Sequence, residues 1–332
     1  MIKGLTVVMM VRNEQGRVGR ALASARPVAE SWLVLDTGST DNTMKEVAAA
    51  TQAWPGLLLQ RPWVDFGHNR TELLQLGAQQ GAKWLLMLDA DHELADHTEL
   101  AKLLATTDAD VLQLPYTSSP TQWVSRIVRC DTGLPWSYGS SGGVHEYLLC
   151  TAPYRRLRVD APRILDHADG ASRAVKWQRD RIALLNEVDR RPDDVRSWFY
   201  LGETYRAEMA FSQAIDAYLH CARLCDGEQA YVARLYAGCL MHSLRREDEA
   251  VEVLTEANTQ RPQRREALLE LCSIHNQGGQ PHLVVQLLGD GDLHRPIPPA
   301  DTEGIYQPAY STDMDKQRQD AMTALAQRAG TR

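Results

Sequence analysis

The sequence lacks the features that mark membrane, secreted and zinc-binding proteins. None of its apolar runs approaches the roughly 20 residues that a membrane-spanning helix needs. Its six cysteines are scattered without a C-x-x-C pair, so we expect buried free thiols and neither zinc nor disulfides. The apolar run Leu5–Val11 has the composition of a strand that leads into polar residues, and it does not indicate a signal peptide. These absences favour a cytoplasmic protein.

Long disordered segments and a strongly basic composition are also absent. The chain has 332 residues, of which 44% are hydrophobic and 24% charged, which suits two globular domains with a core each. The net charge of −7 is uneven: residues 115–197 carry +3, whereas the segments before and after them carry −4 and −6. Only this middle stretch could face an anionic polymer, and its small excess also suits an ordinary mixed-charge surface.

In the first half of the chain, apolar runs alternate with helical patterns. The expected strands are Leu5–Val11, Ser31–Leu35, Leu57–Leu59 and Trp84–Leu88, and helices are expected at residues 17–25, from Met44 onward and at residues 71–81. This alternation is typical of an α/β fold with a doubly wound parallel sheet. Residues 115–120 and 131–143 are rich in Gly, Ser and Pro, and we expect long loops there that form a substrate-binding site or a lid.

Two carboxylates follow the last of these strands. Asp89 and Asp91 stand where the run Trp84–Leu88 ends, at the carboxyl edge of the expected sheet, where open α/β folds bind ligands. Because side chains alternate along a strand, both carboxylates point the same way and repel unless a cation lies between them or one is protonated. Such oxygen ligands suit Mg²⁺ or Mn²⁺ held jointly with substrate phosphates. The ordinary alternative is a solvated strand end followed by a helix cap at residues 96–99.

Three motifs in order resemble the family 2 glycosyltransferases of the GT-A fold. They are Asn13-Glu14, the turn Asp36-Thr37-Gly38-Ser39-Thr40-Asp41-Asn42-Thr43, and Leu88-Asp89-Ala90-Asp91. The resemblance covers about residues 1–170 and implies a Rossmann-like nucleotide-sugar domain, a UDP-sugar donor and a divalent cation, Mn²⁺ or Mg²⁺. The chain departs from the family at Thr37, where most members have a second acid. It also looks like the subgroup that fuses this domain to helical repeats, which includes bacterial peptide glycosyltransferases.

The resemblance also implies roles for single residues that bind the donor. Asp36 would accept a hydrogen bond from the uracil N–H, and the loop Arg12-Asn13-Glu14 would line the base and ribose. Arg70 lies in a segment that resembles the donor-facing segment of the subgroup, and a guanidinium can hold two phosphate oxygens at once. Asp91, with Asp89 directly or through water, would hold the metal against the diphosphate. The structural alternatives are a helix-capping turn for Asp36 and a surface position for Arg70.

Two later motifs supply candidates for the catalytic base and for a third metal ligand. Gly143-Val144-His145-Glu146 resembles a Val-His-Glu signature of the subgroup, and inverting transfer needs a base that deprotonates the acceptor hydroxyl. Glu146 is the first candidate and Asp131 the second, and the alternative for Glu146 is a carboxylate paired with a nearby arginine. The apolar run 164–167 ends in Asp166-His167. By the same resemblance His167 is the third metal ligand, or otherwise a structural histidine.

From about residue 174 the pattern is helical and repeats. Gly202, Gly238 and Cys272 occupy equivalent places, with spacings of 36 and 34 residues. The run from Trp198 to Tyr218 resembles a tetratricopeptide repeat, in which small residues let paired helices pack closely. We expect a glycosyltransferase domain over residues 1–170, about two and a half degenerate repeats over 171–290, and a proline-containing loop with a final helix over 291–332.

The combined prediction is a metal-dependent, inverting glycosyltransferase followed by an all-α helical-repeat domain. The repeats favour a large acceptor. A hydroxyl or thiol of a peptide or protein is the first choice, a hydroxymethylated pyrimidine in DNA is the second, and a saccharide or lipid-linked acceptor is the third. No membrane partner is expected. The alternative from a different class is a non-catalytic repeat scaffold with an inactive sugar-nucleotide domain, and the joint presence of Asp89, Asp91 and Glu146 argues against it.

Overall fold

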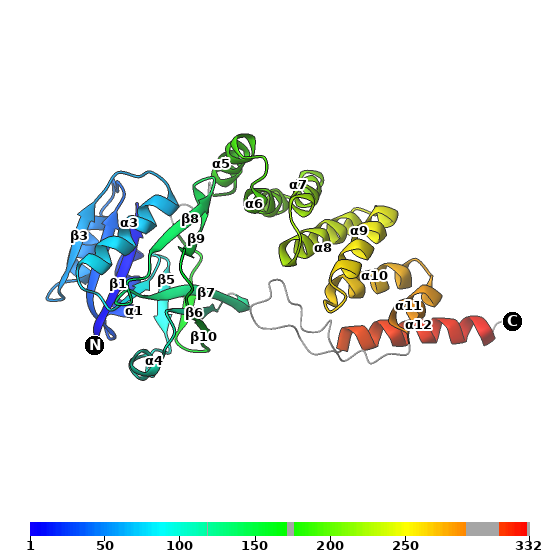
Figure 1. Ribbon diagram of the computed structural model, residues 1–332, viewed down its shortest axis with the longest axis horizontal. Coiled ribbons are helices and arrows are strands. Elements are labelled where there is room, and N and C mark those ends of the chain that lie inside the picture. Colours follow the sequence, from blue (N-terminus) through cyan, green and yellow to red (C-terminus); the bar gives the residue numbers. More distant parts are fainter. Residues whose placement is uncertain (118, 171–175, 290–311, 331–332) are drawn as a thin grey trace. The chain divides into compact units, whose positions relative to one another are not determined.

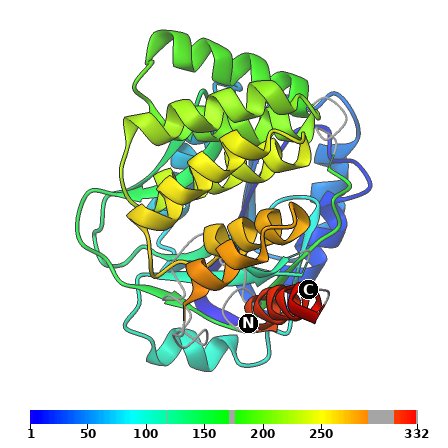
Figure 2. The same cartoon turned by 90° about the vertical axis from the view of Figure 1, so that its right-hand side faces the viewer.

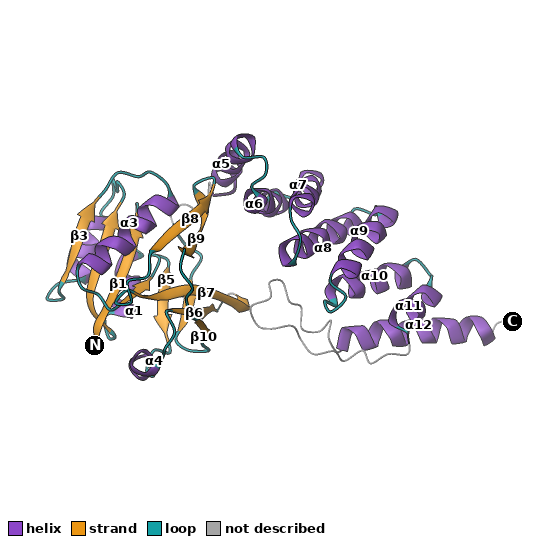
Figure 3. Cartoon of the chain, viewed as in Figure 1, coloured by secondary structure: helices purple, strands orange, loops and turns teal. Residues whose placement is uncertain are grey.

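The chain folds as two compact units, Met1–Arg179 and Asp180–Arg332, in a computed structural model that describes residues 1–117, 119–170, 176–289 and 312–330 (Figure 1). Every described strand belongs to the first unit, and the described elements of the second are all helices (Figure 3). This confirms the predicted order of an α/β domain and an all-α repeat domain. The units divide within helix α5 (Lys176–Arg190), later than the boundary expected at residue 170.

The first unit is built on one large mixed sheet. Its strands in chain order are β1 (Ile2–Val11), β2 (Ala29–Asp36), β3 (Gly56–Gln60), β4 (Trp84–Met87), β5 (His92–Ala95), β6 (Val111–Tyr116), β7 (Ser119–Arg129), β10 (Arg156–Arg158) and β11 (Arg163–Asp166). Their order across the sheet is β3-β2-β1-β4-β7-β6-β11-β5, with β10 paired to β6. The four strands β3, β2, β1 and β4 are parallel, as predicted, and β7 is antiparallel to both β4 and β6.

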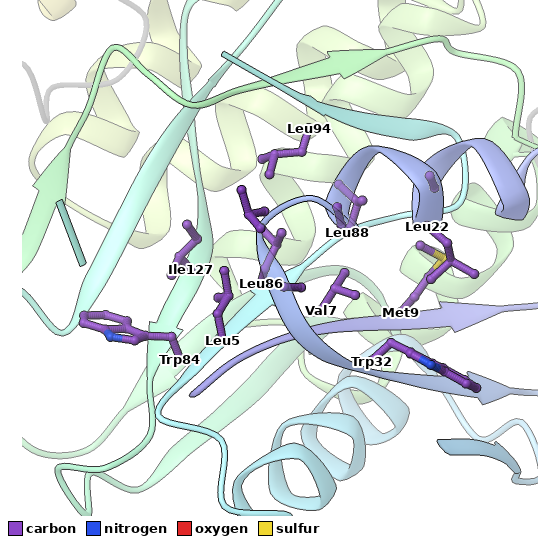
Figure 4. Close-up of a cluster of buried hydrophobic side chains, with 14 of the residues drawn as sticks. Leu5, Val7, Met9, Leu22, Trp32, Trp84, Leu86, Leu88, Leu94 and Ile127 are labelled. Carbon is purple, nitrogen blue, oxygen red and sulfur yellow. The ribbon is translucent and has the colours of Figure 1, made fainter. Parts of the chain in front are cut away.

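Apolar side chains of the central strands point alternately to the two faces of this sheet, and helices cover both faces. The helices of this unit before α5 are α1 (Val18–Ala25), α2 (Thr43–Ala50), α3 (Phe66–Gln79) and α4 (Leu100–Thr106). Val7 and Met9 of β1 pack with α1, α2 and α4 in one core, part of which is drawn in Figure 4. Val8, between them, packs with Leu73 of α3 in a second core on the other face. A strand buried on both faces needs the continuous apolar run that β1 shows.

Two stretches that were expected to be long loops form hairpins instead. Residues 111–116 and 119–129 pair as β6 and β7, and residue 118 lies outside the described residues. Strands β8 (Trp136–Ser141) and β9 (Val144–Cys150) pair in a separate two-stranded sheet. Gly142 and Gly143 form the turn between them with φ values of 60° and 76°, which glycine adopts readily. The glycines therefore mark a tight turn. Of the loop expected at 131–143, residues 131–135 lie outside the strands, and the rest belongs to this hairpin.

Helix α3 begins five residues earlier than predicted, at Phe66. Asp65 is its N-cap, and the carboxylate Oδ1 accepts a hydrogen bond from the backbone N–H of His68 at 2.8 Å. Such a cap satisfies a backbone donor that the helix itself leaves unpaired. Because of this earlier start, Arg70 lies on the helix and faces the rest of the unit from a rigid element.

The second unit stacks its helices in pairs (Figure 2). The pairs are α6 (Val195–Ala207) with α7 (Phe211–Leu224), α8 (Glu228–Ser243) with α9 (Glu247–Gln260), and α10 (Glu266–Gln277) with α11 (Pro281–Leu288). Helix α12 (Thr312–Gly330) packs on α10 and α11, and the predicted proline-containing loop lies outside the described residues. None of the described helices has both the length and the apolar character that crossing a bilayer requires.

The predicted small residues explain how closely these pairs approach. A Cβ at Gly202 would lie 2.6 Å from the ring of Tyr218, and one at Gly238 would lie 2.5 Å from the side chain of Leu254. Each glycine meets the residue sixteen positions later, on the second helix of its own pair. Cys272, the third equivalent residue, is fully buried in a cluster with Leu288, again sixteen positions later. The described repeats thus form three pairs, of which the last ends in the short helix α11.

Candidate active site

The candidate site lies where β4 leaves the centre of the sheet. Strand β4 lies between β1 and β7 and ends at Met87. Asp89 and Asp91 follow at its carboxyl end, and the chain then turns into β5. This is the edge of the sheet at which the sequence analysis placed both carboxylates, and parallel neighbours deliver the ends of β1 and β2 to the same edge.

Two buried arginines hold the carboxylate of Asp89. Arg70 donates from Nη2 to Oδ1 at 2.5 Å, and Arg126 donates from Nη2 to Oδ2 at 2.9 Å. The two arginines are only 6% and 8% exposed. Burial by itself would raise the pKa of Asp89, but the guanidinium groups of Arg126 and Arg70 hold this pKa well below its ordinary value. Asp89 is therefore a charged anchor that uses both of its oxygens on arginines.

Arg70 also connects Asp89 to the predicted base. Its Nε donates to Oε1 of Glu146 on β9 at 2.7 Å. Helix α3 packs against both β8 and β9, and this packing brings residues 70 and 146 together. The structure therefore assembles three predicted residues into one chain of ion pairs, Glu146–Arg70–Asp89. A pairing with an arginine was the structural alternative for Glu146, and this pairing is present. The ion pair uses Oε1 of Glu146 and does not involve the second carboxylate oxygen, Oε2.

Arg126 completes the surroundings of Asp89 from β7. Its Nη2 also contacts the hydroxyl of Tyr116 on β6, and its guanidinium lies 5.5 Å from the centre of that ring. Its Nε is buried without a hydrogen-bond partner among the described residues. A buried guanidinium with an unused donor is unusual, because a desolvated polar group costs free energy when it has no partner.

A second group, formed by Asp91, His92 and Asp166, has the composition of a cation site. One ligand atom from each residue lies within 4.8 Å of the others. The antiparallel pairing of β5 with β11 places Asp166 opposite His92. His92 Nε2 lies 3.8 Å from Asp91 Oδ1 and 3.9 Å from Asp166 Oδ1. Burial lowers the pKa of His92, which keeps its imidazole neutral and able to bind a metal at neutral pH.

His167, the predicted third ligand, is turned away from this group. Its Nε2 lies 2.7 Å from Oε1 of Glu93, and its backbone N–H donates to the carbonyl of Asp91 at 3.1 Å. The backbone bond fixes the strand end next to Asp91, whereas the imidazole is held by Glu93. The preceding residue, Asp166, points to Asp91 and His92 in its place.

Asp131, the second candidate for the base, lies at the opposite edge of the sheet. It follows β7, whose Arg129 pairs with Trp84, the first residue of β4. Its carboxylate binds Arg129 Nε at 2.7 Å and lies 3.7 Å from Nζ of Lys83. Asp89 lies at the other end of β4, about 15 Å away at the usual rise of a strand. This placement removes Asp131 from the candidates.

The two predicted nucleotide loops lie side by side at the ends of β1 and β2. The N–H of Asn13 donates to Ser39 Oγ at 2.9 Å, and the N–H of Thr40 donates to Asn13 Oδ1 at 2.8 Å. The next residue, Glu14, donates its N–H to Thr43 Oγ1 at 2.7 Å. Asn13 has a φ of 56°, which asparagine tolerates better than most residues. The contacts join the loops into one surface.

Asp36 and Arg12 differ in how far they are open to a ligand. Asp36 is fully buried, and its carboxylate accepts hydrogen bonds from the N–H groups of Gly38 and Ser39 at about 3.2 Å. These bonds close a turn directly after β2. They do not cap α2, which begins at Thr43 and has Asn42 as its N-cap. Arg12 is exposed at the end of β1. The role of both residues in binding a base stays a prediction.

Sequence reasoning missed three residues of the site: Arg126, His92 and Asp166. His92 and Asp166 each had a weak signal, because one directly follows Asp91 and the other ends an apolar run beside His167. Arg126 had none, since its place depends on the hairpin of β6 and β7.

Comparisons with known proteins give partial matches. No protein-family model matches the chain. A "TPR repeat-containing protein" of Synechococcus elongatus is 38% identical over 91 residues, which are 27% of this chain and 21% of that protein. An "uncharacterized glycosyltransferase" of Rickettsia felis is 29% identical over 91 residues, which are 27% of this chain and 30% of that protein. One from Rickettsia typhi is 24% identical over 98 residues, covering 30% and 31%.

The chain thus spans less than a third of the length of these curated relatives. Among solved structures, residues 1–349 of S. aureus TarS match with a TM-score of 0.41 and 12% identity, covering 80% of this chain and 93% of that one. In sequence, parts of the chain are similar to two uncharacterized glycosyltransferases and to a tetratricopeptide-repeat protein.

Proposed function

We propose that the first unit is a metal-dependent, inverting glycosyltransferase that moves a sugar from a UDP-sugar to a hydroxyl or thiol of a peptide or protein. The observation that carries the proposal is the meeting of the Glu146–Arg70–Asp89 chain with the group of Asp91, His92 and Asp166 at one strand end. The similarity to the two Rickettsia glycosyltransferases supports the reaction class.

The order of the strands supports the proposed path of the donor. The loops that would bind the nucleoside follow β1 and β2, and the charged groups follow β4, on the other side of β1. Adjacent strands lie about 4.8 Å apart, so β2 and β4 are separated by about 10 Å. A nucleoside at Asp36 and the Arg12-Asn13-Glu14 loop would then extend its diphosphate toward Arg70 and Asp91.

The donor atoms of Asp91, His92 and Asp166 fit a divalent cation. Two carboxylates and one neutral imidazole suit Mn²⁺ better than Mg²⁺, which prefers oxygen alone. These residues, in place of Asp89 and His167, would hold the metal. Asp89 suits a direct role less because both of its oxygens accept from arginines. When bound, a divalent cation offsets the negative charge of the leaving diphosphate.

The proposed step assigns one action to each charged side chain. Oε2 of Glu146 takes the proton of the acceptor, whose oxygen or sulfur forms a bond to the anomeric carbon. The bond from that carbon to the phosphate oxygen breaks, and UDP leaves from the opposite face. Arg70 and Arg126 are held by Asp89 before the substrate arrives, so their positive charge needs no reorganisation during the reaction.

The helical unit supports a large acceptor. Stacked helix pairs form extended surfaces that suit a long chain better than a small molecule. The proposed acceptor is therefore a peptide or protein. We propose in addition that the protein is cytoplasmic and has no membrane partner.

A melting-temperature screen of nucleotide sugars, each with and without Mn²⁺, tests the proposal. A ligand at a hundred times its dissociation constant stabilises a protein by about 2.7 kcal/mol. We expect UDP-sugars to raise the melting temperature of the first unit only in the presence of Mn²⁺. If no nucleotide sugar shifts the transition in either condition, a non-catalytic scaffold becomes the better account.

A further inference from the structure

Three apolar side chains gather where the chain enters α3, and we call Trp63, Val64 and Phe66 the aromatic patch. Trp63 is 37% exposed and Val64 is 53% exposed. The rings of Trp63 and Phe66 meet edge to face, with centroids 4.8 Å apart and planes at 83°. The guanidinium of Arg179 lies 5.3 Å from the centre of the Phe66 ring. Large apolar side chains that are exposed together mark a binding surface more often than isolated ones do.

The aromatic patch lies one helical turn before Arg70 of the candidate active site. Phe66 and Arg70 are four residues apart on α3 and therefore share a face of the helix. The backbone N–H of Phe66 donates to the carbonyl of Gly143 at 3.2 Å, in the turn that leads into β9. Glu146, the proposed base, follows three residues later. A chain bound at Glu146 therefore has the patch within reach of its neighbouring residues.

Polar groups beside the patch are already engaged within its own loop. Asn69 Oδ1 accepts from the N–H of Val64 at 3.0 Å, and its Nδ2 donates to the carbonyl of Pro62 at 3.1 Å. Asp65 Oδ1 accepts from His68 as the helix cap. The amide of Asn69 and Oδ1 of Asp65 therefore already have partners other than the hydroxyls of a bound sugar ring. An apolar side chain needs no such partners, so the patch suits a peptide better than a saccharide.

We propose that the aromatic patch is an acceptor subsite that takes an aromatic or aliphatic side chain of a peptide, within a few residues of the modified hydroxyl or thiol. The inference rests on the proposed glycosyl transfer and adds a sequence preference to it. The bound side chain would pack on the ring face of Trp63, and the edge-to-face contact with Phe66 would fix the orientation of the Trp63 ring.

Transfer to defined peptides tests this subsite. The probes are short peptides with a central Ser, Thr or Cys, flanked either by aromatic and aliphatic residues or by Gly and Ala, with UDP-[³H]glucose and UDP-[³H]N-acetylglucosamine as donors. We expect the full-length protein to prefer the apolar flanks by roughly 10- to 100-fold in kcat/KM, the size expected for burying one such side chain. Trp63→Ala should abolish the preference through KM, and Trp63→Phe should restore part of it.

Two controls separate the subsite from folding and from the proposed function. Leu157→Ala removes a side chain of similar exposure, 38%, from β10 of the first unit and should keep the preference. UDP binding with Mn²⁺, measured by calorimetry, should be equal in all variants. An unchanged preference in Trp63→Ala, or transfer to oligosaccharides and to no peptide, would overturn the subsite and leave glycosyl transfer standing. A wild-type protein that neither binds UDP nor transfers sugar would overturn the proposed function, and the subsite with it.

Discussion

Replacing Asp89 by Asn should destabilise the first unit, whereas replacing Asp91 by Asn should not. Asp89→Asn keeps the shape of the side chain but removes the negative charge shared by Arg70 and Arg126, which are almost fully buried. Removing one partner of a buried ion pair costs about 3–5 kcal/mol. The amide oxygen of Asn still accepts one hydrogen bond, so we expect the low end, about 3 kcal/mol. In a unit of this size that lowers the melting temperature by about 6–12 °C.

Calorimetry of the full chain measures the melting temperatures of the two variants. Hydrogen exchange at β1 and β4 assigns the transition to the first unit. Asp91→Asn should melt within a degree or so of the wild type in the absence of metal, because Asp91 belongs to the cation group. Equal melting temperatures for Asp89→Asn and Asp91→Asn would refute the assignment of Asp89 as the anchor of two arginines.

The pH dependence of the same transition independently tests how much the charge of Asp89 stabilises the folded protein. Its pKa is lowered in the folded protein, so its stabilising contribution is complete above the unfolded value, near pH 4, and is lost as the pH falls through the lower folded pKa. The stability difference between wild type and Asp89→Asn should therefore be constant at neutral pH and shrink only below about pH 4.

Three further predictions concern the base, the repeats and the acceptor. Glu146→Gln should leave UDP affinity nearly unchanged in calorimetry and slow the single-turnover chemical step by roughly 10²–10⁴-fold; an equal loss of affinity and rate would make Glu146 structural. Gly202→Ala should destabilise the second unit by about 1–3 kcal/mol in urea unfolding, because a Cβ there would lie 2.6 Å from Tyr218, and should spare UDP binding. Transfer to a peptide should depend weakly on salt, whereas binding to a hydroxymethylated duplex would weaken by about 0.9 log units per log unit of salt for each phosphate neutralised.

The sheet and its binding edge could be predicted because apolar runs carry that information. Strands buried on both faces read as continuous apolar segments, and polar residues mark where each one ends. Asp89 and Asp91 were placed at the binding edge for the same reason, because they follow the end of an apolar run. Helix α3 was predicted to start at residue 71, although the spacing of Asp65 to His68 is that of an ordinary N-cap.

Strand direction and register could not be predicted from the sequence in the second half of the unit. Asp131 was expected at the site, but β7 runs antiparallel to β4 and so returns its end to the amino edge of the sheet. Adjacent residues of a strand point to opposite faces, so a shift of one position exchanges Asp166 for His167. That choice follows from the pairing of β11 with β5, and Arg126 likewise reaches Asp89 only through the β6–β7 hairpin.

Release of UDP from radiolabelled UDP-sugars tests most directly whether this strand end is a metal-dependent glycosyltransferase site. The wild-type protein with Mn²⁺ should release UDP, slowly with water and faster with a peptide acceptor. Excess chelator should stop the release, and Asp91→Asn, which remains folded, should show none. Release that is equal in the wild type, in Asp91→Asn and in chelator would contradict the account, as would a wild-type protein that binds UDP and Mn²⁺ but never cleaves the sugar, with or without acceptor.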